Sequence, residues 1–300
     1  MKTKTTLLLL LISISSFGQS IEFNDPAFKA NLVSNLNINT DGNDEIDITE
    51  ANAFTGDLEL FYMSDLSGIE YFTNLNKLEC YYGKLTSLDL SQNAMLTELF
   101  ITWTPLQSLD VSDCQLLEHM QIIGSSIAAL DVSRNQTLQT LDCSGNVSLL
   151  DLNVSNNPNL LALDCSSCSL EELDITGCVS LISLDCGENN LESLDMRNGN
   201  NMLMTYSEYV RLSNNSLTCV SVDNPEWSET TWANKDNIAV YSSNCATGIQ
   251  ERQRISNDEI SAVYDLRGAR VNVSELRTKG FYLIRSKDGR TEKRVVSGEF

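Results

Sequence analysis

Leucine and other aliphatic residues recur along the middle of the chain at a nearly constant spacing. In steps of 10 or 11 residues, the second apolar residue of each Leu-x-x-Leu segment falls at positions 78, 88, 99, 109, 120, 130, 141, 152, 163, 173, 184 and 194. A period kept over so many units is typical of a solenoid, in which each unit buries its apolar edge against its neighbours. Two half-units make one coil of about 21 residues.

Stacked coils place residues at the same offset from these anchors in one column. Two residues past the anchors, one half-unit supplies Leu90, Val111, Val132, Val154, Ile175 and Met196, and the other supplies Cys80, Ile101, Ile122, Cys143, Cys165 and Cys186. A thiol in such an inward position behaves as a small hydrophobe. Cys165 and Cys168 form a Cys-x-x-Cys motif, but they fall in different columns, and a zinc site needs four converging ligands. The sequence therefore favours packing over metal binding for these cysteines.

A second column lies five residues past the anchors and is rich in Asn and Cys. Its members are Asn93, Thr104, Cys114, Ser125, Asn135, Asn146, Asn157, Cys168, Cys178, Asn189 and Gly199. It resembles the buried turn column of leucine-rich repeats. The segments LTSLDLSQN (85–93), LQTLDCSGN (138–146) and LLALDCSSC (160–168) resemble the bacterial leucine-rich repeats of nested 10- and 11-residue period, known as IRREKO. The resemblance covers Leu58 to Val222 and implies a mainly β solenoid with short parallel strands on both faces.

The two sides of this solenoid are expected to expose different residues, because alternate side chains of a strand point outward. One side repeats Ser, Asp and Ser, and its Asp columns favour hydrogen-bonded structural carboxylates, with calcium or a cationic partner as the alternative. On the other side the first three coils break the Asp pattern and include large aromatic and apolar residues. They read Lys77/Glu79/Tyr81, Glu98/Phe100/Thr102 and His119/Gln121/Ile123. Contiguous exposed apolar residues mark contact surfaces. The candidate binding patch comprises Tyr81, Phe100, Thr102, Trp103, His119, Gln121 and Ile123. The alternative is that a cap or loop covers them.

Residues 19–56 are predicted to form a helical N-terminal cap. DPAFKANLVSNL (25–36) has an Asp cap, an early Pro and apolar spacing that fit a short helix. NTDGNDEIDITE (39–50) resembles an EF-hand calcium loop, which implies that Asn39, Asp41, Asn43, the Glu45 carbonyl and Glu50 would be ligands. Asn39 replaces the usual first Asp, and Asp44 replaces the Gly of the sharp turn. Two interpretations stay open, a structural loop and a weak extracellular calcium site. Calcium is the one cofactor that the sequence suggests.

The ends of the chain indicate export. Residues 1–18 have Lys2, Lys4, an apolar run and a small-residue cleavage site, as in a secretory signal peptide, and no later run is long enough to span a bilayer. Residues 249–300 are predicted to form a small β tail. Its DLRGARV, KGFYLIR and EKRVV elements resemble the end of a type IX secretion sorting domain. This resemblance implies secretion or display on the outer surface of a Gram-negative bacterium; the alternative is a capping hairpin.

Two cysteines lie outside the two columns of the repeat. They flank the end of the solenoid (57–222) and the C-terminal cap (223–248) that follows it. A secreted chain is in a compartment that permits disulfides. Cys219 and Cys245 are therefore predicted to pair, and two unrelated free thiols are the alternative.

Charge and composition narrow the function. Residues 19–248 hold 7 Lys and Arg against 33 Asp and Glu, whereas residues 249–300 hold 11 against 8. An acidic body argues against nucleic acid, whose phosphates attract Lys and Arg. The chain has one histidine and neither a nucleophile-elbow motif nor a phosphate-binding glycine loop.

The sequence thus predicts a monomeric, non-enzymatic protein that binds an extracellular protein or glycan. One alternative is a calcium-dependent polysaccharide-degrading β-solenoid enzyme, which would need a basic residue on the Asp face; between residues 85 and 195 the coils offer only Arg134. The other alternative is a passive surface spacer.

Overall fold

The computed structural model describes residues 18–205 and 209–245, together with the backbone of four strands between 260 and 296. The chain forms two compact units, Met1–Ser243 and Asn244–Phe300. The expected signal peptide lies outside the described residues except for Gly18. Within the described part, no helix has the length and apolar character needed to cross a membrane.

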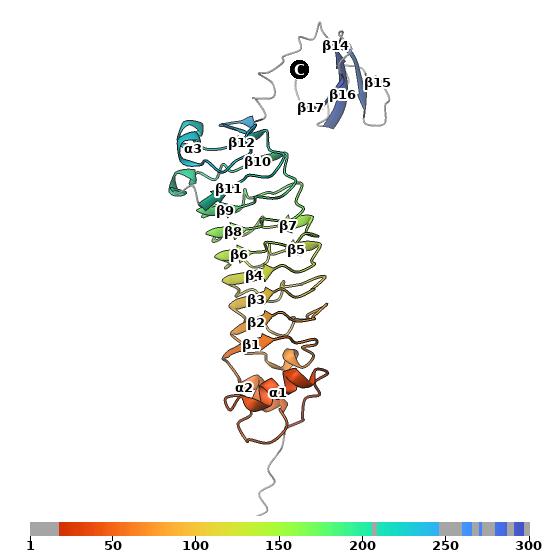
Figure 1. Cartoon of the computed structure of the whole chain (residues 1–300), viewed down its shortest axis with the longest axis vertical. Coiled ribbons are helices and arrows are strands. Elements are labelled where there is room, and N and C mark those ends of the chain that lie inside the picture. Colours follow the sequence, from red (N-terminus) through yellow and green to blue (C-terminus); the bar gives the residue numbers. More distant parts are fainter. Residues whose placement is uncertain are drawn as a thin grey trace, which may run out of the picture. The chain divides into compact units, whose positions relative to one another are not determined.

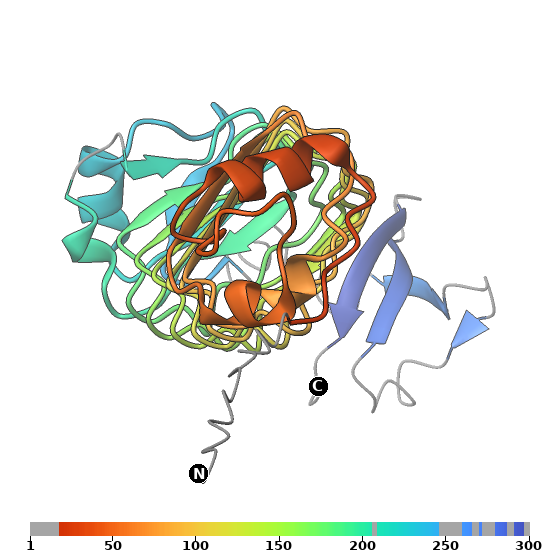
Figure 2. The same cartoon turned by 90° about the horizontal axis from the view of Figure 1, so that it is seen from below.

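Two short helices cap the N-terminal end of the solenoid (Figures 1 and 2). Helix α1 (Pro26–Ser34) begins after Asp25, whose carboxylate accepts the N–H groups of Ala27 and Phe28. Helix α2 (Ile48–Ala53) begins with a capping box between Asp47 and Glu50. The buried face of α1 carries Phe28 and joins the core of the solenoid, so the cap closes the open end of the first coil.

One side of the solenoid is a parallel sheet of eight strands in the order β1-β2-β3-β4-β6-β8-β9-β11. The strands are β1 (Asp57–Phe61), β2 (Lys77–Tyr81), β3 (Glu98–Thr102), β4 (His119–Ile123), β6 (Thr140–Asp142), β8 (Ala162–Asp164), β9 (Ser183–Asp185) and β11 (Val210–Arg211). They pair in register one coil apart, as Leu78 does with Leu99. In β2, β3 and β4 half-exposed residues alternate with buried ones, which confirms the alternation predicted from the anchors.

The opposite side carries shorter pieces of parallel sheet. β5 (Ala129–Asp131) pairs with β7 (Asp151–Asn153), and β12 (Cys219–Ser221) lies between β10 (Ser193–Asp195) and β13 (Val240–Ser242). The predicted mainly β solenoid with parallel strands on both faces is therefore confirmed. A 3-10 turn, η1 (Ile69–Tyr71), lies between β1 and β2.

The predicted inward columns form the core. Every member of the two columns that lie two residues past the anchors is buried. Cys80, Cys143, Cys165 and Cys186 are free, and burial raises the pKa of each thiol, so these groups stay neutral core residues. Cys219 and Cys245 are disulfide-bonded, as the predicted pairing requires, whereas the other seven cysteines are free.

The buried turn column satisfies backbone carbonyl groups of the preceding coil. Asn135 Nδ2 donates to the carbonyl oxygens of Val111 and Cys114 at 3.0 and 2.8 Å. The Cys114 thiol lies at the same place one coil earlier, 3.6 Å from the carbonyl oxygens of Leu90 and Asn93. Asn and Cys are thus interchangeable donors here, because both reach carbonyl groups that would otherwise be buried without a partner.

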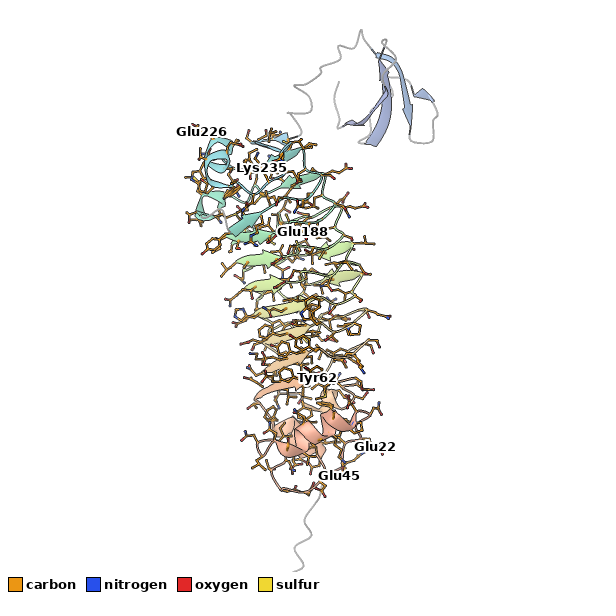
Figure 3. The ribbon with its side chains drawn as sticks, viewed as in Figure 1. Glu22, Glu45, Tyr62, Glu188, Glu226 and Lys235 are labelled. Atoms are coloured by element: carbon orange, nitrogen blue, oxygen red, sulfur yellow. The ribbon has the colours of Figure 1, made fainter. Side chains whose placement is uncertain are left out.

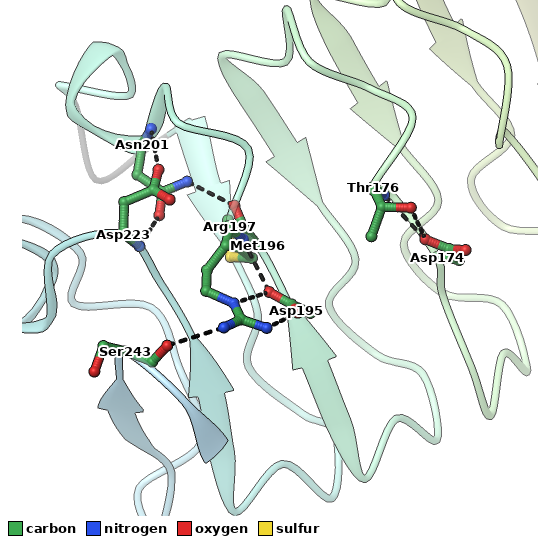
Figure 4. Close-up of polar contacts among 8 residues, drawn as sticks. All are labelled: Asp174, Thr176, Asp195, Met196, Arg197, Asn201, Asp223 and Ser243. Carbon is green, nitrogen blue, oxygen red and sulfur yellow. Dashed lines mark hydrogen bonds and ion pairs between the residues drawn. The ribbon is translucent and has the colours of Figure 1, made fainter. Parts of the chain in front are cut away.

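One assignment to this column is wrong. Gly199 is exposed, with φ 78°, and Asn201 takes the buried place instead. Asn201 Nδ2 donates to the Met196 carbonyl at 2.8 Å, and its Oδ1 accepts the N–H of Asp223 at 2.9 Å (Figure 4). The physical reason is the short 3-10 turn η2 (Asn201–Leu203), which lengthens this coil and shifts the register of the turn by two residues.

The C-terminal end of the first unit holds helix α3 (Pro225–Thr231) and the buried Trp232, whose indole N–H donates to the Met204 carbonyl at 2.9 Å. The second unit is an antiparallel sheet in the order β15-β14-β16-β17. Its strands are β14 (Ile260–Asp265), β15 (Arg270–Val271), β16 (Gly280–Ser286) and β17 (Thr291–Val296). The predicted small β tail is therefore present; most of the residues that join its strands lie outside the described part.

Candidate ligand-binding face

The outward side chains of the eight-stranded sheet form one continuous surface, called here the strand face. Each strand contributes residues at alternate positions, and the in-register pairing places them in columns that run along the solenoid. A pre-formed surface of this kind follows from the repeat itself. Its chemistry depends only on which outward residues each coil carries.

All seven residues of the candidate patch lie together at the N-terminal part of the strand face. Six of them occupy outward, half-exposed positions of β2, β3 and β4, and Trp103 follows β3 directly. Neighbouring coils bring Phe100 beside Gln121 and Thr102 beside Ile123. The members are Tyr81, Phe100, Thr102, Trp103, His119, Gln121 and Ile123.

One lysine and two glutamates beside these residues form ion pairs. Lys77 Nζ lies 4.9 Å from the centre of the Phe100 ring and makes ion pairs with Glu79 at 3.2 Å and Glu98 at 3.3 Å. Partial burial lowers the pKa of Lys77, but these two carboxylates outweigh it and raise the pKa overall. The Tyr81 hydroxyl donates to Glu79 at 3.0 Å. This part of the face thus already holds one ammonium group over a ring and between two carboxylates.

The single histidine is held by a neighbouring coil. His119 Nδ1 lies 2.9 Å from Thr140 Oγ1. The ring stands half-exposed at an outward position of β4.

Three aromatic residues that belong to this surface were missed from the sequence. Phe61, Tyr62 and Tyr82 are all exposed, and they stack in pairs with neighbouring coils: Phe61 with Tyr81 at 5.3 Å and Tyr62 with Tyr82 at 6.1 Å between ring centres. The aromatic doublets at 61–62 and 81–82, placed alike at the ends of β1 and β2, were the signal that could have identified them.

Farther along the strand face, the aromatic residues give way to an acidic groove of about 370 Å3 over β6, β8, β9 and β11. The outward residues of the acidic groove include Asp142, Asp164, Asp185 and Arg211. Burial raises the pKa of Asp142 and of Asp185. Arg211 makes an ion pair with Asp185 at 3.5 Å. The sequence reasoning missed this basic residue because it considered the Asp face only as far as residue 195.

The Asp side chains on both sides of the solenoid hold the turn that follows them. Asp142 Oδ1 accepts the N–H and the hydroxyl of Ser144 at 3.0 and 2.6 Å, and Asp164 does the same with Ser166. On the opposite side Asp174 and Thr176 make the same pair (Figure 4). These local turns account for the recurrence of Asp-x-Ser in the repeat.

The loop that resembles an EF-hand is closed by its own hydrogen bonds. Glu50 is buried; its Oε1 accepts the N–H of Thr40 at 2.8 Å, and its Oε2 accepts the N–H of Asp47 at 3.1 Å. Asn39 Nδ2 donates to the carbonyls of Val33 and Asn43. The Glu45 carboxylate instead pairs with Lys29 at 2.7 Å. Asp41 Oδ2 accepts from the Asn43 amide.

These contacts bear on both interpretations of the loop. Both oxygens of Glu50, the residue expected to be the bidentate ligand, bind backbone N–H groups that a bound cation would need released. Within the described residues no three His, Cys, Asp or Glu side chains form a group that could hold a metal ion.

Comparison with known proteins found no matching family model and no matching curated protein. Among solved structures, the functional domain of InlJ from Listeria monocytogenes, described as including a cysteine ladder, is 28% identical with a TM-score of 0.48. The match covers 69% of this chain and 53% of that one, so the chain spans about half its length. An internalin, inlF, from the same species is 17% identical over 73% of this chain and 71% of that one, with a TM-score of 0.45.

Internalin C2 from the same species is 16% identical, with a TM-score of 0.40, over 67% of this chain and 94% of that one. Because these scores are low, the assignment of the fold rests on the strand pairing and buried columns of this chain itself.

Proposed function

We propose that this protein is a non-enzymatic binding protein that recognises an extracellular protein or glycan through the N-terminal part of its strand face. The observation that carries the proposal is the change of chemistry along one sheet. The outward positions of β1 to β4 include four large apolar or aromatic residues among charged and polar ones, whereas those of β6, β8 and β9 hold only Thr, Ala, Ser and Asp. The four are Phe61, Tyr81, Phe100 and Ile123.

The fold itself does not require these aromatic residues. The coils of β6, β8 and β9 bury the same inward columns, while the outward positions of these strands hold small and polar residues. Exposed aromatic side chains lower solubility, and contiguous ones are characteristic of contact surfaces. Tyr and Trp also supply much contact area at low conformational cost, which suits either a protein or a sugar ring.

The polysaccharide-degrading alternative is less well supported. Arg211 does provide the basic residue on the Asp face that such an enzyme would need. However, Asp142 and Asp164 are occupied by Ser144 and Ser166 in turn-forming hydrogen bonds, and Asp185 is paired with Arg211 itself. A ligand can bind to the strand face while these carboxylates keep their present partners.

The proposed location, secreted or on the outer surface of a Gram-negative bacterium, rests on the leader-like start and on the sorting-like tail in the sequence. Mass analysis of culture supernatant and cell fractions tests it. Chain that starts at Gln19 in the supernatant or on the surface is expected, and chain that stays inside the cell with an intact C-terminus would contradict it.

An array of extracellular proteins and neutral glycans, probed with the chain from residue 19 onward, tests the binding role. The face variant carries Phe100→Ala, Trp103→Ala and His119→Ala. The control variant carries Val147→Ala and Leu150→Ala, which removes apolar residues that are exposed elsewhere. We expect hits that the face variant loses and the control keeps. No hits with any folded chain, as judged by circular dichroism, would favour the passive spacer.

A further inference from the structure

A column of left-handed residues runs along one edge of the strand face. The backbone N–H of each member donates to the carbonyl of the residue that precedes the next member, as Tyr62 does to Tyr81 and Tyr82 does to Thr102. Every member has a positive φ between 53 and 70°: Tyr62, Tyr82, Trp103, Gly124, Gly145, Ser167, Glu188 and Asn214. Figure 3 labels Tyr62, at the N-terminal end of this column, and Glu188, towards its other end.

The first three members are the most costly residues for such a position. A positive φ is a genuine outlier for a bulky side chain, whereas Gly and Asn adopt it readily. Later coils use Gly124, Gly145 and Asn214 at the same place, so the solenoid does not require aromatic residues here. Backbone strain that the fold does not require is a feature of functional sites.

The three aromatic side chains are directed to solvent rather than to the core. The exposed fractions of Tyr62, Tyr82 and Trp103 are 71, 54 and 59%. Trp103 lies over Gly124, whose missing Cβ would be 2.7 Å from the indole ring. Together with Phe61 and Tyr81 on the adjoining outward positions, these residues form the aromatic column, which extends the predicted patch by one coil.

The charges around the aromatic column favour a cationic occupant. Glu59 and Glu79 lie on outward positions of the same strands as Phe61 and Tyr81. Beside the aromatic column, Lys77 shows how this face holds a cation, since its ammonium lies over the Phe100 ring and bridges Glu79 and Glu98. The acidic groove continues the same complementarity along the strand face. Cations attract both carboxylates and ring faces, whereas an anionic ligand would be repelled.

We propose that the aromatic column binds arginine and lysine side chains of an extended, basic polypeptide, with the neighbouring carboxylates neutralising their charge. This inference rests on the proposed function, because it names the class of partner for the strand face.

The test uses a labelled ten-residue peptide of alternating Arg and Gly, with matched Gln-Gly and Glu-Gly peptides, at about 0.15 M salt. The column variant carries Tyr62→Asn, Tyr82→Asn and Trp103→Asn. It keeps the net charge, so bulk attraction to an acidic chain is unchanged. We expect wild type to bind only the Arg-Gly peptide, and the column variant to bind it about tenfold or more weakly, as three cation–π contacts imply.

A second readout separates binding from structure. Because Asn tolerates a positive φ, the column variant is expected to melt at the same temperature as wild type or higher. The single change Tyr82→Asn should weaken binding in part, and the Val147→Ala and Leu150→Ala control should not weaken it.

Equal binding of the Arg-Gly peptide by wild type and the column variant would overturn the proposal, as would a melting temperature lowered as far as by a core truncation. Binding of a neutral glycan in place of the peptide, lost in the face variant, would overturn the cationic partner but leave the proposed function standing. If wild type binds no ligand on the array and no peptide, both this inference and the proposed function are contradicted.

Discussion

At the scale of single residues, the buried turn column shows what a repeat demands of one side chain. Its Asn135 and Cys114 members donate from the same position to carbonyl groups of the coil before them. Such a requirement is visible in the sequence because it recurs at a fixed offset. It also fixes the energetic consequence of a single change.

Asn135→Ala is expected to lower the free energy of unfolding by about 3 kcal/mol, because two buried carbonyl groups lose their donor. Asn135→Cys restores the donor found at Cys114 and should lose about half as much. Urea denaturation of the two variants beside wild type measures both values. Equal losses for Ala and Cys would contradict the donor role and indicate a volume effect.

Asp25 links the cap to the first coil through a carboxylate. Burial alone would raise its pKa, but hydrogen bonds from the N–H and hydroxyl of Ser64 and the N–H groups of Ala27 and Phe28 outweigh burial and lower the pKa from 3.8 to about 2. A lowered pKa in the folded state stabilises the fold above the unfolded value, and this stability is lost as pH falls from about 4 to about 2.

Asp25→Asn is therefore expected to lower the free energy of unfolding by about 2 kcal/mol near pH 7, and the difference from wild type should shrink towards pH 2. Urea denaturation across this pH range measures it. Asp89→Asn, at an exposed carboxylate bound to Ser91 alone, is the matched control and should change little. A difference that stays constant with pH would contradict the assignment.

At the scale of elements, the strand alternation carried most of the site prediction. It placed Tyr81, Phe100 and His119 outward, where the structure has them. It could not identify Tyr62 and Tyr82, because they occupy left-handed turns just after the strands, and a period of two residues says nothing about turn positions. The same limit applies to Gly199, where the inserted turn η2 changed the offset.

The left-handed turns offer a matched pair of glycines. Gly124→Ala and Gly145→Ala should each lower the free energy of unfolding by about 1 kcal/mol, since both have a positive φ. Only Gly124→Ala would also displace the Trp103 indole, because the new Cβ would lie 2.7 Å from that ring, whereas the nearest atom at Gly145 is at 3.6 Å.

Acrylamide quenching of tryptophan fluorescence reads this displacement, with Trp103→Ala as the chain that lacks the signal. Quenching that differs from wild type in Gly124→Ala alone is expected. The same change in both glycine variants, or in neither, would contradict the contact.

For the loop that resembles an EF-hand (39–50), removal of calcium should leave the stability of the protein unchanged. Glu50 already accepts N–H groups with both oxygens, so chelation by EDTA is expected to leave the melting temperature within experimental error of that measured with added calcium. A melting temperature that rises with calcium, and no longer does so in Glu50→Gln, would contradict this prediction and support the calcium site that the sequence resemblance implied.

At the scale of the whole molecule, the period of the sequence was enough to predict the parallel solenoid, because each coil repeats the same buried columns. It also explained seven cysteines as packing, and these are free and buried. The acidic groove with Arg211 was not predicted, since it joins coils on both sides of the lengthened turn near η2. Surface chemistry therefore had to be taken from three-dimensional neighbours rather than from the period.

A ligand that binds at the N-terminal part of the strand face must lose affinity when that surface is changed. The measurement is the dissociation constant of the strongest array hit for wild type, the face variant and the Val147→Ala and Leu150→Ala control, all confirmed as folded. We expect a constant at least about tenfold higher for the face variant alone. Equal constants for wild type and the face variant would place the ligand elsewhere and contradict the proposed binding site.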